Sequence, residues 1–60
     1  MLKVAVFDEE HEKDLEEEMN DFLMKLSENQ VKDIKYSVSV TTDEDGEQLY
    51  CYSALVMYFA

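Results

Sequence analysis

Hydrophobic and polar positions alternate between Lys32 and Phe59 in a way that predicts two long β-strands joined by a tight turn. In the first half of this stretch the period of two is strict, with apolar side chains at Ile34, Tyr36, Val38 and Val40. Such alternation is typical of a strand with one buried face. The second half, Gln48 to Phe59, is apolar at nearly every position, which is typical of a central strand covered on both faces.

The turn between these strands is acidic and contains Asp45-Gly46, where glycine can adopt positive φ at no steric cost. Its length decides which side chains share a face, because a slip of one residue moves a whole set to the other face. A loop of two or four residues matches the apolar positions of the first strand with Leu49, Cys51, Leu55 and Met57. A three-residue loop with a glycine bulge matches them instead with Tyr50, Tyr52, Ala54 and Val56. We favour the first register, because it makes the more aliphatic core.

The N-terminal half predicts a strand over Leu2 to Phe7 and a helix from about His11 to Ser27. Asp8 stands where its carboxylate could cap the free N–H groups of that helix. The apolar residues of the helix have the spacing of a single stripe, and they are Leu15, Met19, Phe22, Leu23 and Leu26. Met24 lies opposite this stripe, so we expect it to be exposed or in an interface.

The element order strand, helix, strand, strand predicts an α+β fold, β-α-β-β, with one helix packed on a three-stranded sheet. Residues 1–60 are expected to form a single domain. The third strand, apolar on both faces, should be central, which gives the sheet order 2-3-1 with the first strand antiparallel to the third. One helix covers only one face, and a soluble monomer rarely leaves the other one bare. Tyrosine suits such a surface, so the candidate interface comprises Tyr50, Tyr52, Tyr58, Val56 and Met24.

Size and charge limit what this chain can bind. Domains this small commonly need disulfides, a metal or oligomerisation, and one cysteine with no Cys/His cluster leaves oligomerisation, most simply a homodimer. The formal charge of −10 disfavours direct nucleic-acid binding and favours a basic protein surface. The candidate acidic surface is the helix face that carries Glu16, Glu17 and Asp21, where spaced carboxylates could imitate phosphates.

No residue pattern predicts catalysis or a cofactor. The acidic turn lacks the first ligand and the distant glutamate of a calcium loop, so a solvated turn explains it better. His11 stands among carboxylates on a predicted surface helix, with no partnered nucleophile. Cys51 lies mid-strand among apolar residues and is interpreted as a small buried hydrophobe. We therefore expect a protein that is not an enzyme and has no metal or cofactor.

The lone thiol fits a reducing cytoplasm, which is the expected location. Ala54 to Ala60 is too short to span a bilayer. We therefore expect no membrane insertion.

Four segments carry a family resemblance: Val6–Glu16, Asn20–Leu23, Asp33–Ser39 and Tyr50–Ala54. Together they make the chain similar to a small sporulation protein family of endospore-forming Firmicutes, over nearly its whole length. The resemblance implies a Gram-positive, Bacillus-like source and a family of largely undefined biochemistry, and it supplies no functional residues.

The leading functional hypothesis is a sporulation-associated accessory protein that binds other proteins without catalysis, as a homodimer. The alternative is a phage-type anti-defence inhibitor that occupies a basic, nucleic-acid-binding surface of a host protein, because phages of such hosts carry similarly short acidic proteins.

Overall fold

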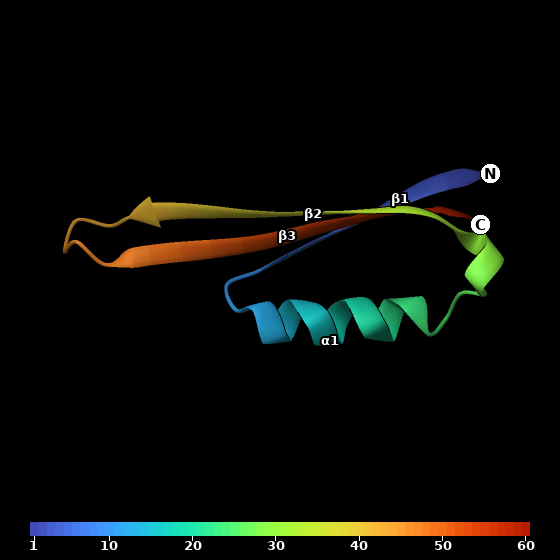
Figure 1. Ribbon diagram of the computed structural model, residues 1–60, viewed down its shortest axis with the longest axis horizontal. Coiled ribbons are helices and arrows are strands. Elements are labelled where there is room, and N and C mark those ends of the chain that lie inside the picture. The colour runs from blue at the N-terminus through green and yellow to red at the C-terminus, as the bar shows by residue number, and fades with distance from the viewer.

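A computed structural model describes residues 1–60 as one sheet with a helix on one of its faces (Figure 1). The element order is β1 (Leu2–Glu9), α1 (Glu12–Leu23), a short 3-10 helix η1 (Glu28–Gln30), β2 (Val31–Thr42) and β3 (Gln48–Phe59). The sheet is antiparallel, with β3 in the centre and the order β1-β3-β2. The predicted α+β class, the sheet order and the central position of the last strand are confirmed.

The helix is shorter than its apolar pattern predicts, because the chain tightens after Leu23. The N–H of Lys25 donates to the carbonyl of Phe22, and the N–H of Leu26 donates to the carbonyl of Leu23, so these bonds span three residues rather than four. Ser27 then begins η1 by bonding with Gln30, whose side chain accepts from the Ser27 N–H at 2.9 Å. The prediction that the helix runs from about His11 to Ser27 is therefore wrong at its C-terminal end.

Asp8 does not cap the helix, because β1 continues through Glu9 and holds Asp8 in extended conformation opposite Ser53. The Ser53 hydroxyl donates to the Asp8 carboxylate at 2.6 Å. The N-cap of α1 is His11, which makes no capping hydrogen bond through its side chain. Asp8, which we expected to cap the helix, is therefore part of β1.

The hairpin register is the opposite of the one we favoured. Thr42 pairs with Gln48, so five residues make the connection, and this odd number places Val40 opposite Tyr50. The Asp43 carboxylate holds this longer turn, because it accepts from the N–H groups of Asp45 (3.0 Å) and Glu47 (2.9 Å). Gly46 supplies the one positive φ, 83°. The apolar residues of β2 therefore share a face with Tyr50, Tyr52, Ala54 and Val56.

This register decides which residues form the core under α1. Phe22 of the helix packs edge-on between Phe7 and Tyr58, with ring centroids 5.5 and 5.2 Å apart. Ala54 and Val56 lie on the same face of β3 and are buried together with Leu15. These three are the only buried residues of the sixty. The expected aliphatic core from Leu49 to Met57 lies on the other side of the sheet.

The helix and the hairpin differ greatly in length. Twelve residues of strand rise about 40 Å, whereas the twelve residues of α1 rise about 18 Å. The distal part of the β2–β3 hairpin therefore projects past both α1 and β1 as an arm (Figure 1). The chain extends 45 × 18 × 11 Å, and its radius of gyration is 13.9 Å. A compact domain of sixty residues would have a radius of gyration of about 10 Å.

Leu15→Ala is expected to be the most destabilising truncation on the helix stripe. Leu15 is 3 % exposed, so losing its side chain should lower the free energy of unfolding by about 2–5 kcal/mol. Urea unfolding followed by far-UV circular dichroism measures this loss. Met24→Ala is the matched control, because Met24 is 83 % exposed and should change the stability by less than about 0.5 kcal/mol. Equal losses for both variants would show that α1 packs through a different face.

Candidate interaction surfaces

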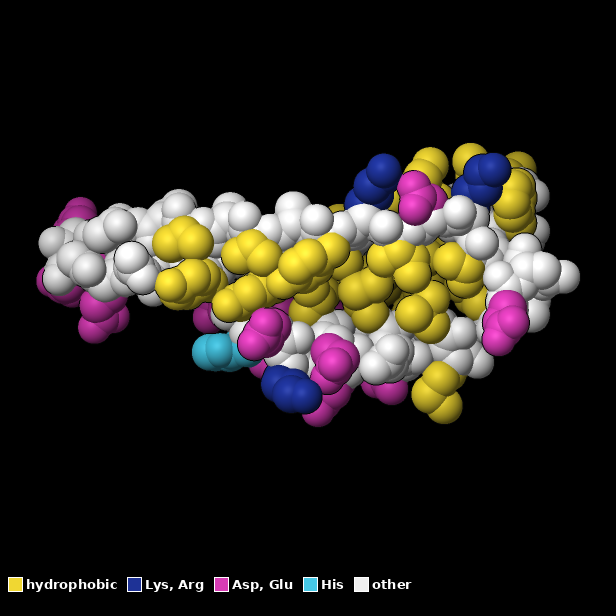
Figure 2. Space-filling view, in the orientation of Figure 1, with side chains coloured by type: hydrophobic (Ala, Val, Ile, Leu, Met, Phe, Trp, Pro, Cys, Tyr) yellow, Lys and Arg dark blue, Asp and Glu magenta, His cyan; other side chains and the backbone are white.

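The first candidate surface is an apolar stripe along the outer strand of the hairpin, which we call the β2 stripe. It consists of Ile34, Tyr36, Val38 and Val40, each between 44 and 58 % exposed although they face the helix side of the sheet. The cause is the position of α1, which packs over β1 and β3 and leaves β2 at the margin. Figure 2 shows this stripe as a continuous apolar band between β2 and α1 that runs on along the arm.

Two hollows open along the seam between α1 and the β2 stripe. The larger, of about 400 Å³, is lined by Leu15, Met19 and Tyr36, with Glu12, Lys13 and Glu16 among its other residues. The smaller, of about 290 Å³, lies between Leu23 and Leu26 at the end of the helix and Val31 and Ile34 of β2. The seam is therefore an exposed margin of the hydrophobic core, with room for further apolar side chains.

The backbone of β2 is also open along this margin. The N–H of Asp43 donates to the carbonyl of Glu47, whereas the N–H of Ile34 donates to the neighbouring Asp33 carboxylate at 2.8 Å. Antiparallel pairs alternate between bonded and non-bonded positions, so every second residue from Ile34 onward directs its N–H and C=O away from β3. Tyr36, Val38 and Val40 therefore present unpaired backbone groups along the outer edge, which is the usual template for strand addition.

The second candidate surface is the sheet face that α1 does not cover. Its apolar side chains belong to β1 and β3 and are half-buried or exposed, and they are Leu2, Val4, Val6, Leu49, Cys51, Leu55, Met57 and Phe59. Over β2 the same face is polar, with Lys35, Ser37, Ser39 and Thr41. The open face is thus aliphatic rather than aromatic, which reverses our expectation because the hairpin register is reversed.

The predicted interface residues are dispersed by the fold. Val56 is fully buried in the core rather than on the open face, and Tyr58 packs against Phe22. Tyr50 lies at the base of the arm and Tyr52 lies opposite the last residue of β1, both beside the β2 stripe, with their rings stacked at 6.1 Å. Burial raises the pKa of Tyr52, with a smaller contribution from Glu12. Met24 is exposed, on the far side of α1 from the sheet.

The predicted acidic surface on α1 is exposed and continuous with further carboxylates. Glu16, Glu17 and Asp21 are all exposed, and Glu16 pairs with Lys13 at 3.2 Å. At the end of β1 the pKa of Glu9 is raised, chiefly because its carboxyl shares a hydrogen bond with Glu18 of α1, and desolvation and repulsion from Glu18 act in the same direction. The acidic residues of α1 thus lie on the side of the helix that faces solvent.

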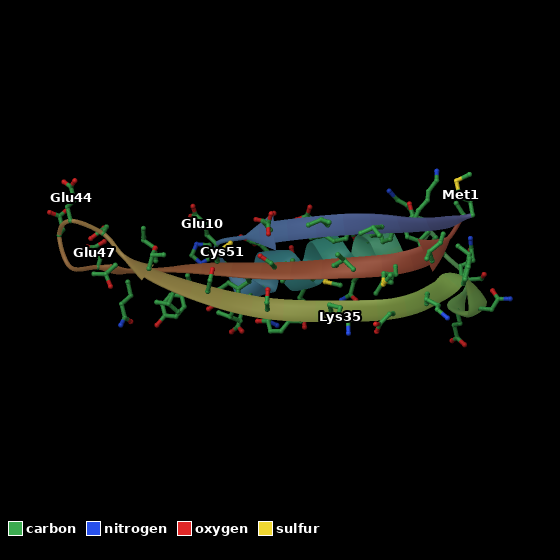
Figure 3. The ribbon with its side chains drawn as sticks, turned by 90° about the horizontal axis from the view of Figure 1, so that it is seen from above. Met1, Glu10, Lys35, Glu44, Glu47 and Cys51 are labelled. Carbon is green, nitrogen blue, oxygen red and sulfur yellow. The ribbon has the colours of Figure 1, made fainter.

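Charge also differs between the two ends of the β2 edge. Lys32, Asp33 and Lys35 lie near its beginning, where Lys35 pairs with Asp33 at 3.5 Å and Lys32 leaves a net positive charge, whereas the turn at its end carries Asp43, Glu44, Asp45 and Glu47. In Figure 3, Lys35 lies on the outer edge of β2, and Glu44 and Glu47 lie at the tip of the arm. Between them, Tyr36 to Thr42 contains no charged residue.

The one histidine and the one cysteine of the chain lie close to each other at the start of the helix and the middle of the sheet. His11 and Cys51 line one hollow of about 330 Å³ together with Asp8, Glu9, Glu10 and Asp14, but no hydrogen bond joins the thiol to the imidazole. The Cys51 sulfur lies 3.7 Å from the Ser53 hydroxyl, and four carboxylate side chains line the hollow with it. No group of three or more His, Cys, Asp or Glu side chains is arranged to hold a metal ion. Neither the length nor the hydropathy of any helix would let it cross a bilayer.

The candidate surfaces that sequence patterns missed are the β2 stripe and the open face of the sheet. The alternation from Ile34 to Val40 predicts one buried face, but a twelve-residue strand is about twice as long as the twelve-residue helix that has to cover it. Which side chains lie on the open face depends on the length of the hairpin turn, and the residue pattern did not decide that length.

Comparison with known proteins gives a family match over the whole length of the chain. A family model, sporulation protein Cse60, matches residues 1–60. A relative from Bacillus subtilis (strain 168), described as sporulation protein cse60, is 69 % identical over 58 residues, which cover 97 % of this chain and 97 % of the relative. No solved structure matches.

Glu18→Gln is expected to lower the pKa of Glu9 toward its usual value of 4.5, because the main partner of the shared proton is replaced. A raised pKa in the folded state favours folding below the unfolded pKa, and that contribution is lost as the pH rises through the folded pKa. The variant should therefore lose part of the pH dependence of stability just above pH 4.5. Carboxyl-carbon NMR titration measures the shift. Glu17→Gln is the control, and an equal change there would contradict the pairing of Glu9 with Glu18.

Proposed function

The chain belongs to the sporulation protein Cse60 family, and we propose that it is a non-enzymatic accessory protein of sporulation that acts in the cytoplasm through protein binding, as a homodimer. The sporulation context comes from the family and from the Bacillus subtilis relative. Both are sporulation proteins, so the alternative of a phage-type inhibitor gains no support from either. The free thiol of Cys51 suits a reducing compartment.

The observation that carries the proposal is the large apolar surface that the fold leaves unburied. The accessible surface is 4746 Å², and twelve large hydrophobic residues are exposed. A monomer of 7.1 kDa is expected to expose about 4,100 Å². The difference of roughly 650 Å² per chain approaches the ~800 Å² that each partner buries in a standard protein interface. Association would therefore bury apolar surface that folding of the single chain leaves exposed to solvent.

The surroundings of the reactive side chains favour a non-enzymatic role. A nucleophile needs a base within hydrogen-bond reach and a site that excludes water. The Ser53 hydroxyl is bonded to Asp8 in a strand pair, and Cys51 faces carboxylates. These contacts suit a structural role on the sheet.

A homodimer also fits the distribution of charge. Two chains of formal charge −10 repel each other, so they should meet through surfaces that carry few carboxylates. The β2 stripe and the open sheet face meet this condition, whereas α1 and the turn do not. Tyr50 and Tyr52 remain candidate contact residues, because they are the cross-strand neighbours of Val40 and Val38 on the same face of the sheet. Glu16, Glu17 and Asp21 would stay in solvent.

The wild-type chain is expected to sediment as a dimer at micromolar concentration. Because association stabilises the folded state by mass action, its melting temperature should rise with protein concentration. Analytical ultracentrifugation and thermal melts over a hundredfold concentration range measure both effects. The triple variant Glu16→Gln, Glu17→Gln, Asp21→Asn should keep the dimer mass. A monomer mass up to millimolar concentration, with a constant melting temperature, would refute the homodimer.

A further inference from the structure

We propose that β2 pairs along its free edge with β2 of a second copy of this chain, antiparallel and centred on Ser37, which merges two sheets into one of six strands. The inference rests on the homodimer proposed above and specifies which surface forms it. The strand order would be β1-β3-β2 followed by β2-β3-β1 of the partner, with both helices on the same face.

The first reason is the unpaired backbone. Ile34, Tyr36, Val38 and Val40 point their N–H and C=O groups outward, as derived above from the bonds of Ile34 and Asp43. Centring on Ser37 brings Tyr36 opposite Val38 of the partner subunit, so these residues exchange backbone bonds. At the outer pair, Ile34 keeps only its carbonyl free, because Asp33 already accepts its N–H. The edge of β1 is less suited, because it is shorter and carries Lys3, Asp8 and Glu9.

The second reason is that the β2 stripes of the two copies are complementary to each other in this pairing. In this register Ile34 lies opposite Val40 of the partner subunit, and Tyr36 lies opposite Val38 of the partner subunit. All four residues of the stripe therefore meet an apolar residue, and aromatic with β-branched neighbours is a favourable cross-strand combination. On the polar face Ser37 meets Ser37 of the partner subunit, and Lys35 meets Ser39 of the partner subunit.

The third reason is charge complementarity along the edge. Antiparallel pairing sets the basic beginning of each β2 beside the acidic turn of the other copy, so that Lys32 lies next to Asp43 of the partner subunit. A shift that centres the pairing on Val38 places Asp33 opposite Asp43 of the partner subunit, which is repulsive. A further shift to Ser39 leaves Ile34 opposite Glu44 of the partner subunit. Centring on Ser37 avoids both.

The fourth reason is the open seam. The partner's Val40 would lie beside Ile34, at the hollow of about 290 Å³ that Leu23, Leu26 and Val31 also line. The partner's Val38 would lie beside Tyr36, at the hollow of about 400 Å³ next to Leu15 and Met19. Burying only the excess surface of roughly 650 Å² per chain would remove about 1,300 Å² from water in the pair, which is within the range of specific interfaces.

The test is a symmetric disulfide at Ser37. Ser37 lies on the proposed two-fold axis as a non-bonded pair, whose Cα atoms should be about 4.5 Å apart, within disulfide range. Ser37→Cys is made in a Cys51→Ser background, because Cys51 lies opposite Ser39 on the same face. With oxidised glutathione as electron acceptor, non-reducing gels should show covalent dimers.

Ser39→Cys in the same background is the matched control, because it is equally exposed on the same strand and face. Its two copies would be displaced by four residues along the strands, about 13 Å, so it should cross-link at least about tenfold more slowly. Circular dichroism verifies that both variants are folded.

Three results would overturn the proposal, and they differ in what else they affect. Cross-linking of Ser39→Cys as fast as Ser37→Cys overturns the register. No cross-linking of Ser37→Cys, while the wild-type chain has a dimer mass, overturns the edge pairing and leaves the homodimer in place. A monomeric wild-type chain overturns the homodimer and the edge pairing together.

Discussion

The helix of this protein is too short for its hairpin, and most of its unusual features follow from that mismatch. A helix gains about 1.5 Å per residue and a strand about 3.3 Å, so elements of twelve residues each cannot cover one another. α1 ends where the chain must turn back to begin β2, and it lies over β1 and β3. The β2 stripe and the arm are therefore left at the margin of a core that buries only three residues.

The turn at the tip of the arm has an effect far from its own position. Asp43 accepts two backbone N–H groups and holds a connection of five residues, and that odd number sets the facing of the side chains along the hairpin as far as Asp33, where the register shifts. Tyr58, Ala54 and Val56 consequently face α1, while Leu55 and Met57 face away from it. A polar contact in an exposed turn thus decides which set of side chains becomes the core, because register changes reverse both faces at once.

Carboxylates and apolar surface are kept apart in this chain. The acidic residues gather on α1, on the loop before it and on the arm's turn, whereas the edge of β2 from Tyr36 to Thr42 is uncharged. Exposed charge steers encounters and maintains solubility, whereas buried apolar contacts supply most of the affinity. For the association proposed above, the seam between α1 and β2 is the side of the molecule that offers apolar contact.

The sequence by itself determined the element order, the α+β class, the central position of β3 and the membership of the sporulation family. These depend on hydrophobic periodicity and on residue identity, which are local properties of the chain. Tertiary structure decided the rest. Pairing of Asp8 with Ser53 extended β1 at the expense of a helix cap, and the turn around Asp43 selected the tyrosine face for the core. The placement of α1 over β1 and β3 exposed the β2 stripe, because whether an apolar residue is covered depends on the reach of a neighbouring element rather than on the alternation of its own strand.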